Sequence, residues 1–249
     1  MAGHSKWANI KHRKGRQDAK RGKLFAKLAK AIEVAAREGG GNPDFNPTLA
    51  TAVDKAKSAD MPNDNIERAI KRGTGEVEGA VYEEMYYEGY GPGGVALYVH
   101  ILTDNRNRAA SDVRSTFTRY NSSLGEPGSV GYLFSQNGVI LAKGSEEEVM
   151  LAGLDAGAED IREAGEGMFE VVTAAGDLTT VREALASAGI TIESAEVTQI
   201  PSTTIPVEES DAKRVLRLID ALDDLDDVQE VYSNYDIDDS VMENVLAEA

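Results

Sequence analysis

The chain has 249 residues, with 43 acidic and 26 basic side chains and a formal net charge of −17. The absence of cysteine excludes a disulfide framework, a thiolate zinc site, an iron–sulfur cluster and a cysteine nucleophile. Three histidines leave little room for an imidazole metal site, and we expect no metal and no cofactor. The longest apolar stretch, residues 95–102, is far shorter than the ~20 residues that span a bilayer. Because residues 1–7 lack an apolar signal core, we expect a soluble cytoplasmic protein with no membrane partner.

The charge is divided unevenly along the chain. Residues 1–37 carry eleven basic and two acidic side chains, a net charge of +9. Residues 73–249 carry ten basic and 35 acidic side chains, a net charge of −25. A basic segment attracts polyanions, whereas an acidic body repels them. The division therefore predicts a basic N-terminal arm that binds an anionic partner.

The N-terminal region is predicted to be helical. Residues 1–22 are rich in Lys, Arg and Gly and are expected to form an extended arm. Apolar residues at helical spacing predict a helix over residues 23–38, which the glycines at 39–41 end. Asn46 and Pro47 are typical of a helix start and predict a second helix over residues 47–58. A third helix is predicted over residues 63–72.

The rest of the chain is predicted to alternate strands and helices. The expected strands cover residues 82–88, 95–103, 129–135, 139–143, 159–164, 168–173, 191–200 and 228–232. The expected helices cover residues 105–120, 145–157, 178–189 and 210–222. Residues 138–200 thus follow the β-α-β-β-α-β order of a ferredoxin-like unit.

These elements predict an α+β fold with an N-terminal helical domain followed by two α/β domains. Residues 80–135 supply too few elements for a complete domain, and the C-terminal helix and strand would complete it. We therefore expect a ferredoxin-like unit inserted into a discontinuous sheet domain. The expected division is 1–77, 78–137 plus 203–249, and 138–202. The alternative, an independent C-terminal tail, would give residues 203–249 too small a core of their own.

Most motifs that resemble catalytic or ligand sites are better explained structurally. Residues 89–94 match G-x-G-x-x-G, but they lead into a strand rather than a helix, which predicts a hairpin loop instead of a dinucleotide site. An acidic run lacks the EF-hand order and is predicted to be a solvated turn: Asp223, Asp224, Asp226 and Asp227.

Other acidic and imidazole side chains give no reacting set. Glu83, Glu84 and Glu88 lie on a predicted strand and are expected to face water. His100 lies in an apolar strand and is expected to be a core or edge histidine. Because no nucleophile, base and orienting group can be nominated together, we expect no enzyme.

The basic arm holds the main candidate site. Its cations are too closely spaced to neutralise one another, so phosphate contacts would give strong, salt-sensitive binding. Trp7, the only tryptophan, could stack on a base or dock against the body. The candidate nucleic-acid-binding residues are Lys6, Trp7, Lys11, His12, Arg13, Lys14, Arg16, Lys20, Arg21 and Lys23, with Lys27 and Lys30 on the helix that follows.

A second candidate lies on the helix predicted over residues 105–120. Arg106 and Arg108 fall in its first turn, where cations oppose the helix dipole at a cost of ~0.3–1 kcal/mol each. Arg108 and Arg119 are predicted to point away from the apolar face. These arginines either meet an anion or form surface salt bridges.

Several segments resemble the YebC family. They are residues 3–12 (GHSKWANIKH), 35–40 (AAREGG), 61–70 (MPNDNIERAI), 87–96 (YEGYGPGGVA), 102–108 (LTDNRNR) and 128–130 (GSV). The similarity spans most of the chain and weakens after about Leu141. One departure is Asn121-Ser122-Ser123, where the family often has paired glycines, and it puts a local turn in question.

The resemblance implies a non-enzymatic cytoplasmic protein of three domains. The family is described as DNA-binding transcriptional regulators, and mitochondrial relatives as translational activators. Bacterial relatives are also linked to ribosomes stalled on proline-rich sequences. The flexible spacing of Lys, Arg and Gly in the arm, together with the acidic body, favours ribosomal RNA over a DNA duplex. DNA remains the alternative. No dimerisation repeat is present, so we expect a monomer.

Overall fold

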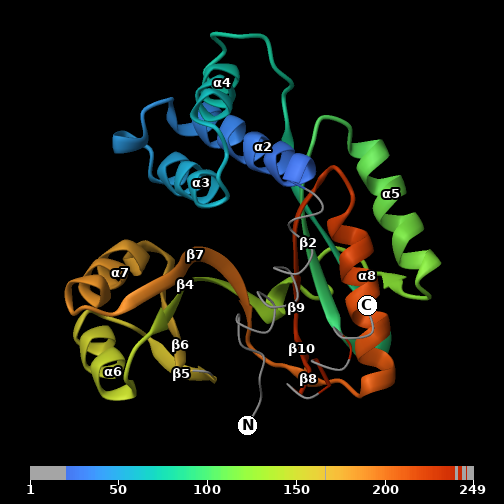
Figure 1. Cartoon of the computed structure of the whole chain (residues 1–249). Coiled ribbons are helices and arrows are strands. Elements are labelled where there is room, and N and C mark those ends of the chain that lie inside the picture. The colour runs from blue at the N-terminus through green and yellow to red at the C-terminus, as the bar shows by residue number, and fades with distance from the viewer. Residues whose placement is uncertain (1–20, 166, 239–240, 243–244, 246–249) are drawn as a thin grey trace.

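The computed structural model describes residues 21–165, 167–238, 241–242 and 245. Three groups of elements surround the centre of the molecule (Figure 1). The helical group lies at the top of the view, the α6–α7 unit at the lower left, and the sheet covered by α5 and α8 at the right.

The helical group forms around α2 (Arg21–Gly39). It is followed by the 3-10 turn η1 (Pro43–Phe45), α3 (Pro47–Ser58) and α4 (Asn63–Gly73). Asn46 begins α3, because its Oδ1 accepts a hydrogen bond from the Leu49 backbone N–H at 3.1 Å. The core between the helices includes Leu28, Ile32, Leu49 and Ala69, all buried. Each predicted helix of this region is therefore present.

A second group is a four-stranded sheet in the order β3-β1-β2-β9. Its strands are β1 (Glu83–Tyr90), β2 (Ala96–Thr103), β3 (Ser123–Leu124) and β9 (Val228–Ser233). Two helices, α5 (Arg106–Arg119) and α8 (Glu209–Asp223), share one core with the sheet. Because β9 pairs with β2 and α8 packs against α5, the C-terminal segment completes this sheet domain.

The third group has the ferredoxin-like order. It comprises β4 (Phe134–Lys143), α6 (Glu146–Asp155), β5 (Asp160–Gly165), β6 (Met168–Ala174), η4 (Ala175–Asp177), α7 (Leu178–Ser187) and β7 (Thr191–Pro201). The strands are antiparallel in the order β5-β6-β4-β7. A short parallel pair, β8 (Ile205–Pro206) with β10 (Tyr235–Asp236), joins the chain leaving this unit to the C-terminal segment.

The fold class is therefore as expected: an α+β protein with N-terminal helices and a ferredoxin-like unit inserted into a discontinuous sheet domain. The segment of residues 89–94 lies at the β1–β2 hairpin, as predicted: Gly89 and Tyr90 end β1, and η2 (Pro92–Gly94) in the loop that follows reverses the chain. Gly93 and Gly94 take φ values of 68° and 78°, which only glycine adopts without strain. No helix within the described ranges is both long and apolar enough to cross a membrane.

One pair of predicted strands is wrong. Residues 129–135 and 139–143 were expected to form two strands, but β4 runs unbroken through Asn137-Gly138, and η3 (Gly131–Leu133) precedes it. This dipeptide usually marks a turn. Here Gly138 serves close packing instead, since a Cβ would collide with Thr173 Oγ1 and lie 2.9 Å from Leu178 Cβ.

The turn at Asn121 forms although residues 121–123 lack the paired glycines that the YebC family often has there. Asn121 has a φ of 51°, in the left-handed region. Asparagine tolerates this region better than other residues that carry a side chain. The turn therefore forms, and β3 follows it to pair with β1.

Candidate nucleic-acid interface

Most of the predicted arm lies outside the described residues. This applies to eight of the candidate residues: Lys6, Trp7, Lys11, His12, Arg13, Lys14, Arg16 and Lys20. Arg21 begins α2. The remaining candidates are Lys23, Lys27, Lys30, Arg106, Arg108 and Arg119, and the structure places each of them.

The lysines of α2 form a row that faces the turn between α8 and β9. Lys23 Nζ donates to the Asp224 carbonyl at 2.8 Å. Lys27 Nζ donates to the Asp223 carbonyl at 2.6 Å and to its carboxylate at 2.9 Å. Because the spacings of four and three residues place these lysines on one helix face, they reach successive groups of the same turn.

Lys30 continues the row to the end of the turn. Its Nζ donates to the Asp226 carbonyl at 2.8 Å and to Asp227 Oδ1 at 3.0 Å. The same Nζ lies 5.4 Å from the ring centroid of Tyr82, within cation–π range. The lysine row therefore joins the helical group to the sheet domain.

Asp227 is the centre of this contact. Its side chain is only 6% exposed, and besides Lys30 it accepts hydrogen bonds from Arg108 Nε at 3.0 Å and Arg108 Nη2 at 2.9 Å. Burial raises the pKa of Asp227, but the hydrogen bonds from Lys30 and Arg108 outweigh burial and lower the pKa below its ordinary value. The prediction of a solvated turn is therefore wrong at Asp227.

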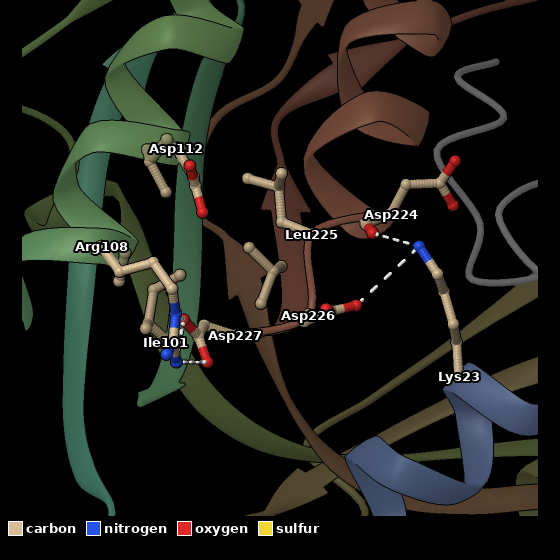
Figure 2. A pocket seen from close by; sticks show the side chains of 11 residues that line it. Lys23, Ile101, Arg108, Asp112, Asp224, Leu225, Asp226 and Asp227 are labelled. Carbon is tan, nitrogen blue, oxygen red and sulfur yellow. Dashed lines mark hydrogen bonds and ion pairs between the residues drawn. The ribbon is translucent and has the colours of Figure 1, made fainter. Parts of the chain in front are cut away.

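Figure 2 shows how this turn meets α5 and α2. Arg108 and Asp227 face each other, and Lys23 reaches from α2 toward Asp224 and Asp226. Between them lies a cavity of about 200 Å³, which Asp112 and Val113 of α5 also line. Both signs of charge meet here, and within the described ranges no group of three or more acidic or imidazole side chains could hold a metal ion.

The α5 arginines differ in their surroundings. Arg108 also contacts Asp104 at 2.7 Å, so it forms the salt bridges that were one of its two predicted roles. Arg106 is 69% exposed, and its Nη1 lies 3.5 Å from Glu83. Arg119 ends α5 on an exposed face. Arg106 and Arg119 therefore remain accessible to an anion from solvent.

Lys55 makes a second contact between the groups. From α3 it lies 3.1 Å from Glu196 on β7 and 3.7 Å from Glu230 on β9. One side chain thus touches strands of both sheets. Nothing in the local sequence indicates this role, because the three residues meet only in the folded chain.

Glu88 departs from its expected exposure. It is 9% exposed, and its carboxylate accepts hydrogen bonds from the backbone N–H groups of Gly128, Val130 and Gly131 at 2.6–2.7 Å. Burial raises the pKa of Glu88, but these three donors outweigh burial and lower it. Glu88 therefore holds the loop before β4 in place and has a structural role.

The fold and these contacts define the class of protein. This is a three-part α+β protein in which ion pairs attach a basic N-terminal helix to a discontinuous sheet domain. Residues 5–76 match the model of the TACO1/YebC protein N-terminal domain, and residues 82–235 match that of the TACO1/YebC second and third domain. The chain belongs to the TACO1/YebC family, which confirms the resemblance seen in its motifs.

Similar proteins cover nearly the whole chain. One from Acidothermus cellulolyticus is 57% identical over 98% of this chain and 100% of its own length, and is named "Probable transcriptional regulatory protein". One from Thermobifida fusca has the same name, identity and coverage. The crystal structure of the conserved hypothetical protein Aq1575 from Aquifex aeolicus is similar, with a TM-score of 0.83 and 48% identity. That match covers 94% of this chain and 98% of Aq1575.

Proposed function

We propose that this protein is a non-enzymatic, nucleic-acid-binding regulator of gene expression that acts through its basic N-terminal arm. The observation that carries the proposal is the net charge of +9 over residues 1–37, joined to a body of net charge −25. Closely packed cations bind phosphates by releasing counterions. The names of the relatives support a regulatory role.

The described candidates take different parts in this proposal. Lys23, Lys27 and Lys30 attach α2 to the sheet domain, so the arm before them provides the main phosphate contacts. Arg106 and Arg119 are exposed and add contacts to the same polyanion. Arg108 is paired with Asp227 and Asp104, so we assign it first to positioning Asp227 and only second to contact with phosphate.

We further propose that the target is ribosomal RNA, where the protein relieves stalling on proline-rich sequences as a cytoplasmic monomer. An acidic body repels an extended duplex, whereas an arm can enter a folded RNA while the body faces away. The alternative is a DNA-binding transcriptional regulator, which the names of the relatives favour.

Salt dependence tests the binding mode. If about five arm cations contact phosphates, log K should fall against log salt concentration with a slope of about −3.5 to −4.5. Replacing Lys11, Arg13, Lys14 and Arg16 by Gln should remove most of this slope. Four matched replacements outside the arm, at Lys143, Arg162, Arg182 and Arg217, should leave it unchanged. Equal losses in both variants would contradict binding through the arm.

Competition at one fixed salt concentration tests the target. Labelled ribosomal RNA bound to the full chain is challenged with unlabelled ribosomal RNA, bulk DNA or defined duplexes. Preferential displacement by ribosomal RNA supports the ribosomal proposal. A strong preference for one DNA duplex would overturn it in favour of transcriptional regulation.

A further inference from the structure

A large cleft lies where the three groups of elements meet. Its cavity measures about 740 Å³, and it is lined by α2 and α3, by β7, by the C-terminal end of α8, and by the face of β1, β2 and β9 that points away from the α5–α8 core. Figure 1 shows these elements around the centre of the molecule. Leu24, Leu28 and Ala31 of α2 give one wall an apolar surface.

The opposite wall carries stacked aromatic rings. Tyr86 stacks on Tyr98 with ring centroids 4.6 Å apart, and on His100 at 4.9 Å. Tyr232 of β9 lies 6.3 Å from Tyr98. Tyr86, His100 and Tyr232 line the cleft and are only partly buried. Such faces attract cations and flat apolar groups.

The cleft is acidic. Seven carboxylates line it against three lysines, a net charge of −4 with His100 neutral. The acidic residues are Glu38, Glu84, Glu196, Asp220, Asp223, Asp224 and Glu230, and the lysines are Lys23, Lys27 and Lys55. This excess of negative charge repels phosphates and favours a cationic occupant.

One polar group of the cleft also lacks a partner. The buried Gln229 Nε2 makes no hydrogen bond to any residue that the structure describes. A buried donor without an acceptor costs about 1–3 kcal/mol. This Nε2 has almost no accessible surface, so an acceptor in the cleft would reach it only after the Gln229 side chain turns outward.

We propose that the cleft binds the chain's own basic segment, residues 1–20, and thereby competes with nucleic acid for it. The sequence of this segment has six basic side chains and one acidic, a net charge of +5 that complements the cleft, and it contains the only tryptophan. It joins α2 at Arg21, and Lys23 and Leu24 of the first helical turns already line the cleft. This tether gives an effective concentration in the millimolar range. The competition rests on the proposed function, whereas the docking does not.

Trp7 fluorescence tests the docking directly, because the full chain has no other tryptophan. Without nucleic acid and at low salt, we expect Trp7 to be shielded from acrylamide. The cleft variant changes Glu38, Glu84 and Glu230 to Gln, and the arm variant changes Lys11, Arg13 and Lys14 to Gln. Each should raise the quenching constant toward that of tryptophan in water. The matched control changes Glu126, Glu147 and Glu163, which are exposed outside the cleft. Thermal unfolding of each variant confirms that it is folded.

Nucleic-acid affinity tests the competition separately. Relief of docking should make the cleft variant bind nucleic acid about threefold to tenfold more tightly than the unmodified protein. The docking would be overturned if Trp7 were fully exposed in the unmodified protein. It would also be overturned if Trp7 were shielded but neither set of changes altered its quenching constant. Weaker nucleic-acid binding by the cleft variant would also overturn it, by making the cleft part of the nucleic-acid site. If no variant binds nucleic acid while Trp7 still responds to the cleft changes, only the proposed function fails.

Discussion

At the scale of single residues, Asp227 shows how a buried charge can be stable. It accepts hydrogen bonds from Lys30 and Arg108, which come from two different groups of elements. A buried carboxylate is tolerated only when such partners replace its lost water. The neighbouring Asp226 has a side chain 85% exposed, with Lys23 3.9 Å away, and depends on no such partners.

Asp227→Asn should lower the free energy of unfolding by about 2 kcal/mol. The change removes the charge but keeps the shape, so Lys30 and Arg108 lose their shared carboxylate. Urea denaturation measures the effect. The matched control, Asp226→Asn, should stay within about 0.5 kcal/mol of the unmodified protein. Equal effects of the two changes would contradict the central role of Asp227.

The stability difference between the unmodified protein and Asp227→Asn should depend on pH in one direction. Because the folded pKa of Asp227 is below the ordinary value of 3.8, its ion pairs stabilise the fold above that value. The stabilisation is lost as the pH falls through the folded pKa. The stability difference between the unmodified protein and Asp227→Asn should thus stay constant from about pH 5 to 8 and shrink below about pH 4.

At the scale of elements, the contact between α2 and α4 depends on a missing side chain. A Cβ on Gly73 would lie 2.5 Å from the Glu33 carbonyl oxygen and 2.7 Å from Ala36 Cβ. The two helices therefore approach each other more closely than alanine would allow. The ion pair of Arg72 with Glu33, with Nε 2.6 Å from Oε1, holds the same crossing.

Gly73→Ala should destabilise the protein by about 1–3 kcal/mol, because the helices must separate. Helix propensity alone predicts the opposite sign, a gain below the ~1 kcal/mol of a helix interior because Gly73 is the last residue of α4, so the direction of the change separates the two effects. Thermal unfolding provides the measurement. Gly176→Ala is the control, since a Cβ there meets nothing within 4 Å and should have little effect.

At the scale of the whole molecule, we propose the division 1–77, 78–137 plus 203–249, and 138–202. The core of the ferredoxin-like unit consists of residues from that unit alone. The core of the sheet domain instead combines α5 with α8 and β9, which lie about a hundred residues further along the chain. The two cores therefore differ in how far they depend on distant segments.

A fragment of residues 134–202, which starts where β4 starts, should fold and unfold cooperatively by circular dichroism. A fragment of residues 78–137 should not, since β2 loses its partner β9 and the sheet loses the cover of α8. A 134–202 fragment without a cooperative transition would contradict the proposed division.

Local pattern accounts for most of what could be predicted from the sequence. Helix and strand positions depend on periodicity and on caps such as Asn46, which neighbouring residues decide. The β4 prediction failed because Asn137-Gly138 forms a turn in most settings, and only packing against Thr173 and Leu178 keeps it in a strand. Glu88 was placed in water for a similar reason, since strand alternation cannot reveal the loop that covers it.

The sequence by itself determined the order of the helices and of most long strands, the TACO1/YebC resemblance and the division of charge, because each is readable from neighbouring residues. It did not reveal the short strands β3, β8 and β10, whose pairing partners are distant in the chain. Only the tertiary structure decided which charges are paired. Lys27 and Asp223 are 196 positions apart in the sequence, so the residues around each of them give no sign of their contact. The acidic cleft has the same origin, since α2, β2, β7 and β9 line it together only after the inserted unit and the C-terminal segment have returned to the first sheet.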